Sequence, residues 1–277
     1  MILKRTSLFI FFILFCAGMF AQNKMTLREM KQKTDSILAE ADLLYRFEKA
    51  AWIATDSARA KPDLQSKLGT YVLYQVQDML IVAFINRNVD TCIYEAIFSP
   101  YLEAPVKQTI TNRALNETEK KLISVMTKAQ KPIIDKKYPL SCPEGFKFNM
   151  QLIPCDNGYK LYLLTGTTQM NIIPFGNDYL FRTDKEGNIL GWRSFHSSLL
   201  VQPVTINGQK ITRLSHSHLA REPFISATDI CTFRLYGSYY GLNEFSVYSP
   251  AFSLYFTYKL DSNTIEISTQ QVSSTLQ

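Results

Sequence analysis

Two histidines, a serine and an aspartate lie close together in the last quarter of the chain, and all four are residue types found around catalytic metal ions. The pattern is His216-Ser217-His218, seven further residues, Ser226, two further residues and Asp229. Neutral imidazoles and carboxylates bind zinc, and a hydrolytic zinc site uses three protein ligands while a fourth position stays open for water. We therefore expect a Zn2+ site with His216, His218 and Asp229 as its ligands.

The spacing of these residues predicts how the chain would bring them together. Residues 211–215 have the composition of a strand, and residues two apart in a strand point to the same side, so His216 and His218 can face one ion. Ser226 is a predicted helix N-cap with Asp229 at the third helical position, which places the carboxylate in the first turn. A strand end and a helix start would then supply three ligands. Helix capping alone also explains the Ser-x-x-Asp spacing.

The same four positions resemble the motif of the JAB/MPN (JAMM) metalloprotease family, in which a histidine pair is followed after seven residues by Ser-x-x-Asp. The resemblance extends to an expected helix over residues 226–236 and expected strands over 244–250 and 252–258. It implies a JAB1/MPN-like mixed α/β domain over residues 141–277, with a cytidine-deaminase-like sheet and helices. It further implies a zinc-dependent hydrolase of peptide or isopeptide bonds, in which Ser226 would help to stabilise the oxyanion.

The segment that should carry the catalytic glutamate of this family departs from its pattern. Residues 159–166 fit the family register at Leu164 and Gly166, but Tyr159 stands where the glutamate belongs and Tyr162 where the first glycine belongs. A phenol with a pKa of about 10 is a poor proton shuttle for zinc-bound water at neutral pH. The departure therefore favours an alternative, a metal- or peptide-binding protein with a degenerate site and no catalysis.

Three other polar side chains could contribute to the site. Glu222 lies in the seven-residue loop and Glu186 in an expected turn, and either could in principle replace the absent glutamate, although neither is favoured. His196, at the end of an expected strand, could be a further ligand or a substrate contact, although a lone histidine in a strand is more often structural. All three histidines of the chain fall between residues 196 and 218.

The N-terminal segment, residues 1–21, has the features of a secretory signal peptide. Lys4 and Arg5 form a basic start, residues 8–15 form an apolar core too short for a comfortable membrane span, and small residues precede an expected cleavage after Ala21. An uncleaved anchor helix is the alternative. We expect export to the periplasm, the outer envelope or the extracellular space, where a peptide or protein of the cell envelope would be the substrate.

Charge and cysteine content limit the partners and the crosslinks. The chain has a formal net charge of +6 without a dense Lys or Arg run, which disfavours nucleic acid and is compatible with association at a membrane surface. In an oxidising compartment three disulfide pairings are open to Cys92, Cys142, Cys155 and Cys231, and a local bridge between Cys142 and Cys155 is conceivable. Four buried free thiols are the alternative.

The region over residues 22–140 is expected to form a helix, a small antiparallel sheet and a second helix. The first helix covers residues 25–60 and starts with a capping box at Thr26 and Glu29. The second covers residues 116–130. Runs rich in Val, Ile, Tyr and Phe predict strands over 70–76, 79–85 and 91–98.

The region over residues 141–277 follows a proline-containing linker and is expected to start with three hairpins that deliver the histidine pair. Their turns are predicted from Asn-Gly and Gly-Asn steps. The paired segments are 147–154 with 159–166, 178–183 with 189–196, and 198–205 with 210–215. The chain is therefore predicted to be α+β, with two domains after the signal peptide.

Three functions remain open from these residues. The first is an exported zinc metallopeptidase, and the second is a catalytically silent metal- or peptide-binding protein of the envelope. The third is a structural envelope protein in which the motif holds no ligand. Bound zinc would exclude the third, and cleavage of a peptide library would separate the first from the second.

Overall fold

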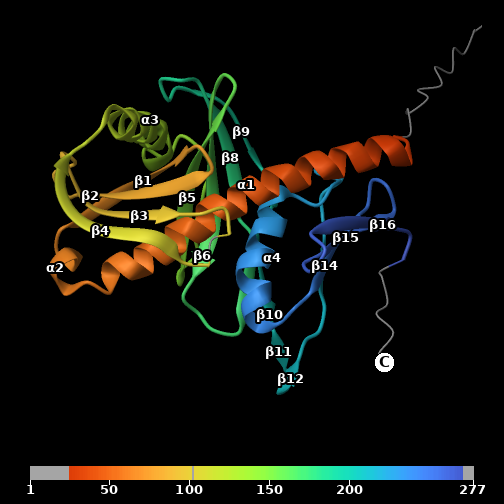
Figure 1. The fold of residues 1–277 in the computed structure, drawn as a ribbon. Coiled ribbons are helices and arrows are strands. Elements are labelled where there is room, and N and C mark those ends of the chain that lie inside the picture. The colour runs from red at the N-terminus through yellow and green to blue at the C-terminus, as the bar shows by residue number, and fades with distance from the viewer. Residues whose placement is uncertain (1–24, 102, 271–277) are drawn as a thin grey trace, which may run out of the picture.

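The computed structural model describes residues 25–101 and 103–270, and Figure 1 shows their arrangement. The predicted signal peptide lies outside the described residues. Within the described ranges no helix is both long and apolar enough to cross a membrane. Helices and mostly antiparallel sheets follow one another along the chain, so the fold is α+β.

Helix α1, Leu27–Arg59, connects the two halves of the molecule. The predicted capping box is formed, because the Thr26 hydroxyl accepts from the Glu29 N–H at 3.2 Å and the Glu29 carboxylate accepts from the Thr26 N–H at 2.7 Å. A buried stripe that includes Leu44 and Phe47 faces the rest of the protein. In Figure 1 the helix runs across the whole molecule, and it contacts strands of both the first and the last sheet.

The first sheet follows a short helix, α2, Pro62–Gln65, and is antiparallel with the order β1-β2-β3-β4. Its strands are β1 Leu68–Val76, β2 Met79–Asn86, β3 Thr91–Phe98 and β4 Pro105–Ala114. The three predicted strands are confirmed. The fourth was not predicted, because β4 is mostly polar and none of its side chains is fully buried, so it lacks an apolar run.

Helix α3, Glu117–Ile134, packs beside this sheet and begins at the predicted cap, Asn116. The predicted end before Pro132 is wrong, because the helix continues through this proline. A proline removes one backbone donor, and in the last turn of a helix that loss is confined to a single bond. The carbonyl of Lys131 still accepts from the Asp135 N–H at 2.9 Å.

The second sheet is also antiparallel, with the order β5-β6-β8-β9. Its strands are β5 Phe146–Cys155, β6 Gly158–Thr167, β8 Tyr179–Thr183 and β9 Ile189–Ser194. Gly158 has φ 152°, and a Cβ there would collide with the carbonyl oxygen of Thr183, so the turn between β5 and β6 requires glycine. The first two predicted hairpins are confirmed.

The third predicted hairpin is wrong in its pairing. Residues 199–203 form β10, Leu199–Pro203, which pairs with β7, Ile172–Gly176. The turn at Asn207-Gly208 forms, but it joins only the two-residue strands β11, Thr205–Ile206, and β12, Gln209–Lys210. Strand β13, Leu214–Ser217, pairs with a strand that lies after the next helix. Partners distant in sequence therefore displaced the local pairing.

The last sheet contains the histidine pair and has the order β13-β14-β15-β16. Helix α4, Ala227–Tyr240, connects β13 to the parallel strand β14, Glu244–Ser249, as parallel pairing requires a crossover. Strands β15, Leu254–Lys259, and β16, Thr264–Ser268, complete the sheet in antiparallel fashion. β16 was not predicted.

Two buried hydrophobic clusters support these elements, and each contains residues from both sides of residue 140. In the larger cluster Phe47 and Phe84 belong to the N-terminal half and Phe233 to α4. In the smaller one Leu122 of α3 packs with Phe181 of β8. The four cysteines of the described ranges are free thiols; Cys92 and Cys231 are buried and Cys142 and Cys155 exposed.

Candidate metal centre

The three histidines and one aspartate meet in a buried cluster. One ligand atom from each of His196, His216, His218 and Asp229 lies within 4.8 Å of all the others, so the group could hold a metal ion. His196 follows the end of β9, His216 lies in β13, His218 follows β13 directly, and Asp229 lies in the first turn of α4. The structure thus brings the three predicted ligands together and adds His196.

The four ligand groups are evenly spaced. Nε2 of His196 lies 3.2 Å from Nε2 of His216 and 3.0 Å from Nε2 of His218, and the latter two atoms are 3.1 Å apart. Oδ1 of Asp229 lies 3.2 Å from Nε2 of His196 and 3.4 Å from Nε2 of His216, and Oδ2 lies 3.0 Å from Nε2 of His218. Four ligands at about 2.0–2.1 Å from zinc form a tetrahedron with edges of about 3.3 Å. The three Nε2–Nε2 spacings are close to these edges, and the carboxylate meets the histidines with both of its oxygens.

His196 is held in place by a carboxylate behind it. Its Nδ1 lies 2.7 Å from Oδ1 of Asp178, a buried residue just before β8. The other oxygen of Asp178 accepts a short hydrogen bond from the hydroxyl of Thr228 in α4. An ionised carboxylate only accepts, so Nδ1 of His196 donates, and in the neutral ring its Nε2 presents a lone pair to the cluster.

The two histidines of the pair are held differently. Nδ1 of His218 lies 3.1 Å from the carbonyl oxygen of Glu222, which only accepts, so Nε2 of His218 also faces the cluster as an acceptor. Nδ1 of His216 is buried and has no hydrogen-bond partner among the described residues. His216 is also the most exposed of the four, with 6 % of its side chain accessible. It is therefore the least firmly anchored member.

Asp229 uses its two oxygens for two tasks. Oδ2 accepts from the backbone N–H of Ser226 at 2.9 Å and from the Ser226 hydroxyl at 2.7 Å, which completes the predicted cap of α4. Oδ1 is buried, and no hydrogen-bond donor in the described part of the chain reaches it. Capping thus orients the carboxylate so that Oδ1 faces His196 and His216, while Oδ2 also reaches His218.

The Ser226 hydroxyl is engaged within the cap itself. It accepts from the Asp229 N–H at 3.0 Å and also lies 2.8 Å from the hydroxyl of Thr228. Its own proton is donated to Asp229, so this donor is used inside the protein. These contacts give Ser226 a clear part in positioning Asp229, whereas the oxyanion role stays a prediction.

The electrostatics of the cluster follow from its burial and its mixed charges. Burial by itself would lower the pKa of His196, but the carboxylates of Asp178 and Asp229 hold this pKa well above its ordinary value. Burial would raise the pKa of Asp229, yet the three imidazoles hold it well below its ordinary value. For His216 burial dominates and lowers the pKa. Acceptor groups that face one another in a buried space need a cation between them.

The two tyrosines at the family's glutamate and glycine positions, and the two carboxylates that could replace the glutamate, lie outside this cluster. Tyr159 is buried in the smaller hydrophobic cluster. Tyr162 donates a short hydrogen bond to Glu40 of α1. The carboxylate of Glu222 lies 3.6 Å from Arg193, and Glu186 is exposed in the turn between β8 and β9. None of these side chains has a contact with the four ligand groups in the described part of the protein.

Two members of the centre were not assigned from the sequence. His196 was treated as more often structural, and Asp178 was not considered. The one available signal was that all three histidines fall between residues 196 and 218. Asp178 gave no signal, because only the folded sheet places it behind the imidazole of His196.

Comparisons with protein-family models, with curated proteins and with solved structures give no match. The chemistry of the centre therefore follows from its own residues. Three imidazole nitrogens and one carboxylate gathered within 4.8 Å are a ligand set suited to a divalent transition-metal ion.

Proposed function

We propose that this chain is an exported metalloprotein that binds one Zn2+ ion through His196, His216, His218 and Asp229, and that the ion stabilises the C-terminal half without activating water. The observation that carries this proposal is the set of four ligand groups 3.0–3.4 Å apart. Structural zinc sites have four protein ligands, whereas catalytic sites have three and keep one position open. Here His196 occupies the position that a catalytic water would need.

The choice of zinc follows from geometry and donor type. Imidazole binds zinc, copper, iron and nickel, so the donor atoms alone do not select the ion. The spacing of the three Nε2 atoms, close to the edges of a tetrahedron, supports zinc over copper(II) or nickel(II), which favour tetragonal arrangements, and over octahedral ions. Burial of all four side chains to 6 % exposure or less leaves little room for the further ligands of a larger coordination sphere.

The ion would connect three parts of the C-terminal half. His196 comes from the end of the second sheet, His216 and His218 from the start of the last sheet, and Asp229 from the helix between β13 and β14. When bound, zinc supplies a crosslink between these segments, and the free energy of binding adds to that of folding. This is a stabilising task like that of a disulfide, which the described cysteines do not form.

Metal analysis of the purified protein tests the proposal. We expect one zinc per chain, and X-ray absorption at the zinc edge should show three imidazoles and one carboxylate oxygen. His196→Ala should reduce the imidazole count to two and admit water as a ligand. After reconstitution, a zinc content below about 0.1 per chain would mean that the site does not bind zinc, and this result would contradict the proposal.

A zinc-dependent peptide hydrolase of the JAB/MPN type is the second candidate. The motif positions His216, His218, Ser226 and Asp229 support it by resemblance, and the weak anchoring of His216 supports it independently. If His216 left the ion, then His196, His218 and Asp229 would remain as three ligands with one open position, as hydrolysis requires. The absent glutamate argues against it, because no other carboxylate of the described chain contacts this group except Asp178, which holds His196.

The two candidates differ in what zinc-loaded protein does to a peptide library. The first predicts stoichiometric zinc with no cleavage above that of the His218→Ala variant. The second predicts cleavage that zinc restores after chelation and that His216→Ala increases or preserves. Cleavage that His216→Ala abolishes while zinc stays bound would contradict both candidates. The first predicts no cleavage, and the second predicts that cleavage does not need His216.

A further inference from the structure

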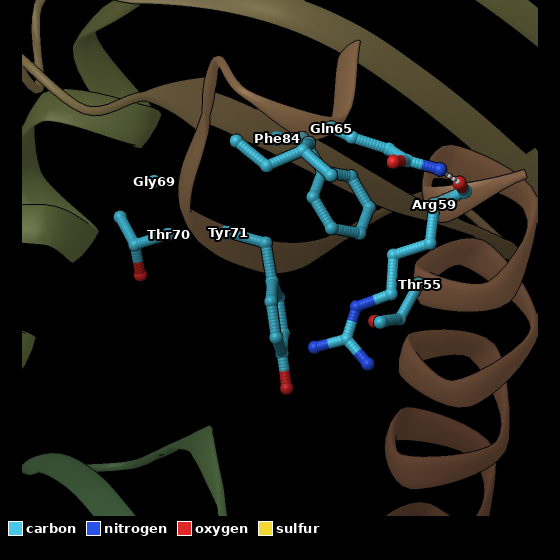
Figure 2. A pocket seen from close by; sticks show the side chains of 8 residues that line it. Thr55, Arg59, Gln65, Gly69, Thr70, Tyr71 and Phe84 are labelled. Carbon is cyan, nitrogen blue, oxygen red and sulfur yellow. Dashed lines mark hydrogen bonds between the residues drawn. The ribbon is translucent and has the colours of Figure 1, made fainter. Parts of the chain in front are cut away.

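A second site lies between the C-terminal part of α1 and strand β1, and it shares no residue with the metal centre. The cavity has a volume of about 580 Å³ and is lined by residues of α1, α2, β1 and β2 (Figure 2). An adjoining cavity of about 370 Å³ shares Thr55, Arg59 and Tyr71 with it. Volumes of this size accommodate small-molecule ligands.

Three hydrogen-bond donors converge where the two cavities meet. Figure 2 shows the guanidinium of Arg59 extending from α1 towards the phenol of Tyr71, with Thr55 one turn earlier on the same helix. No hydrogen bond or ion pair of the described residues uses the side chains of Arg59 or Thr55. The Tyr71 hydroxyl accepts from Nε2 of Gln151 at 3.1 Å, so its own proton is free to be donated.

The apolar part of the cavity lies beside these donors. The rings of Tyr71 and Phe84 pack against each other with centroids 5.6 Å apart, and Leu68 lines the same wall. Aromatic walls of this kind offer flat contact surfaces to a planar group. Polar donors on one side and aromatic rings on the other are the usual composition of a small-ligand site.

The exposed charged groups around the two cavities carry one positive charge in excess, which suits a ligand with one negative charge. Arg59 and Lys147 are cationic and Asp56 is anionic, and all three are exposed. The remaining carboxylate, Glu48, is buried and already accepts hydrogen bonds from Trp52, Asn149 and Gln151. The guanidinium of an arginine fits a carboxylate through two parallel hydrogen bonds.

We propose that this cavity binds a monoanionic ligand in which a carboxylate is attached to a flat apolar group. The carboxylate lies on Arg59 and accepts from the hydroxyls of Thr55 and Tyr71, and the apolar group lies against Tyr71 and Phe84. The ligand is either a free aromatic acid or the C-terminal residue of a peptide, which present the same carboxylate. This inference is independent of the metal centre and of its function.

Isothermal titration calorimetry of the full chain with matched probes tests the site. N-acetylphenylalanine and its C-terminal amide differ only in the charge of the end group. We expect the acid to bind at least about tenfold more tightly than the amide, since a hydrogen bond to a charged group is worth about one factor of ten or more. A four-residue peptide ending in phenylalanine, as acid and as amide, then shows whether a free acid or a peptide end is preferred.

Arg59→Gln is the decisive variant, with Lys107→Gln as a charge-matched control on the exposed strand β4. Because the Arg59 guanidinium has no partner among the described residues, Arg59→Gln should keep the melting temperature of the wild type. It should also remove the preference for the acid, whereas Lys107→Gln should retain it. Equal binding of acid and amide to the wild type, an unchanged preference in Arg59→Gln, or no binding of the acid at about 10 mM would each overturn the proposal.

Discussion

Two polar clusters of this protein each centre on a buried carboxylate but differ in the hydrogen-bond donors and acceptors around it. Around Glu48, three donors surround one carboxylate: Trp52 Nε1 at 2.7 Å, Asn149 Nδ2 at 2.6 Å and Gln151 Nε2 at 2.6 Å. Around Asp229, the neighbours of the carboxylate are imidazole nitrogens, of which those of His196 and His218 are acceptors when the rings are neutral. The first cluster satisfies its carboxylate from within the protein, and the second could hold a metal ion.

The difference separates a structural network from a ligand site. A buried polar group is stable when each donor has an acceptor, and Glu48 meets that condition between α1 and β5 without any added atom. Acceptors that face one another are stable only with a proton or a metal ion among them. Burial alone therefore does not identify a functional site, whereas the balance of donors and acceptors does.

The largest expected effect is zinc dependence confined to the histidine cluster. With free zinc about a thousandfold above its dissociation constant, zinc should increase the free energy of unfolding by about 4 kcal/mol. Urea unfolding with zinc and with a chelator measures this difference. In His218→Ala the difference should vanish, while in Glu48→Ala it should persist. A wild-type protein that unfolds identically in both conditions would contradict the metal centre.

The next effect concerns the cluster around Glu48. Glu48→Ala removes the acceptor of one buried donor, Gln151, and of two half-buried donors, Trp52 and Asn149. It should lower the free energy of unfolding by about 3 kcal/mol, because each orphaned donor costs roughly 1–3 kcal/mol and part of the site can admit water. Chemical denaturation measures the loss, and zinc content should stay unchanged. Glu117→Ala, at a side chain that is 90 % exposed, is the control and should change stability by less than about 0.5 kcal/mol.

A smaller effect is expected for Asp178, which contacts the proposed ligand His196 from outside the cluster. Asp178→Asn keeps the shape of the side chain but weakens the acceptor that orients His196, so zinc should bind about 10–100-fold more weakly. Competition with a chromophoric chelator measures the affinity. Asp261→Asn at an exposed turn is the matched control and should leave it unchanged. An Asp178→Asn protein with wild-type zinc affinity would mean that His196 needs no support or binds no metal.

The smallest effect is a pH dependence that belongs to Glu48. Burial raises the pKa of this carboxyl, against the three hydrogen bonds that lower it, so the folded protein binds more protons than the unfolded chain above the ordinary glutamate pKa. Stability from this group is therefore present at low pH and is lost as pH rises through the folded pKa, with a limiting slope of about 1.4 kcal/mol per pH unit.

Comparison with Glu48→Gln isolates this contribution, since other titrating groups are common to both proteins. Tyr71 and Cys231 nearby stay neutral in this range, because burial raises the pKa of each. The wild type should lose stability relative to Glu48→Gln as pH rises from about 4 to 7. If the difference in the free energy of unfolding between the two proteins stays constant with pH, or shifts in favour of the wild type, then the hydrogen bonds to Glu48 outweigh the effect of its burial.

Local features of the fold could be predicted because neighbouring residues determine them. The capping boxes at Thr26 and Ser226 need only residues three apart, and the turn between β5 and β6 needs only Gly158 and its neighbours. Long-range pairing could not be predicted in the same way. The parallel partner of β13 lies beyond α4, and β10 pairs with β7 across more than twenty residues, although Asn207-Gly208 favoured a local hairpin.

The sequence by itself determined that His216, His218 and Asp229 could share an ion, because strand alternation and helix capping fix where these three side chains point. Only the tertiary structure decided that His196 closes the group and that Asp178 orients it. The physical reason is that the pairing of β8 with β9, Tyr179 opposite Ser194, carries Asp178 and His196 to one edge of the second sheet. That edge reaches the start of α4 only after the sheets have packed, and it brings a third imidazole to the place where water was expected.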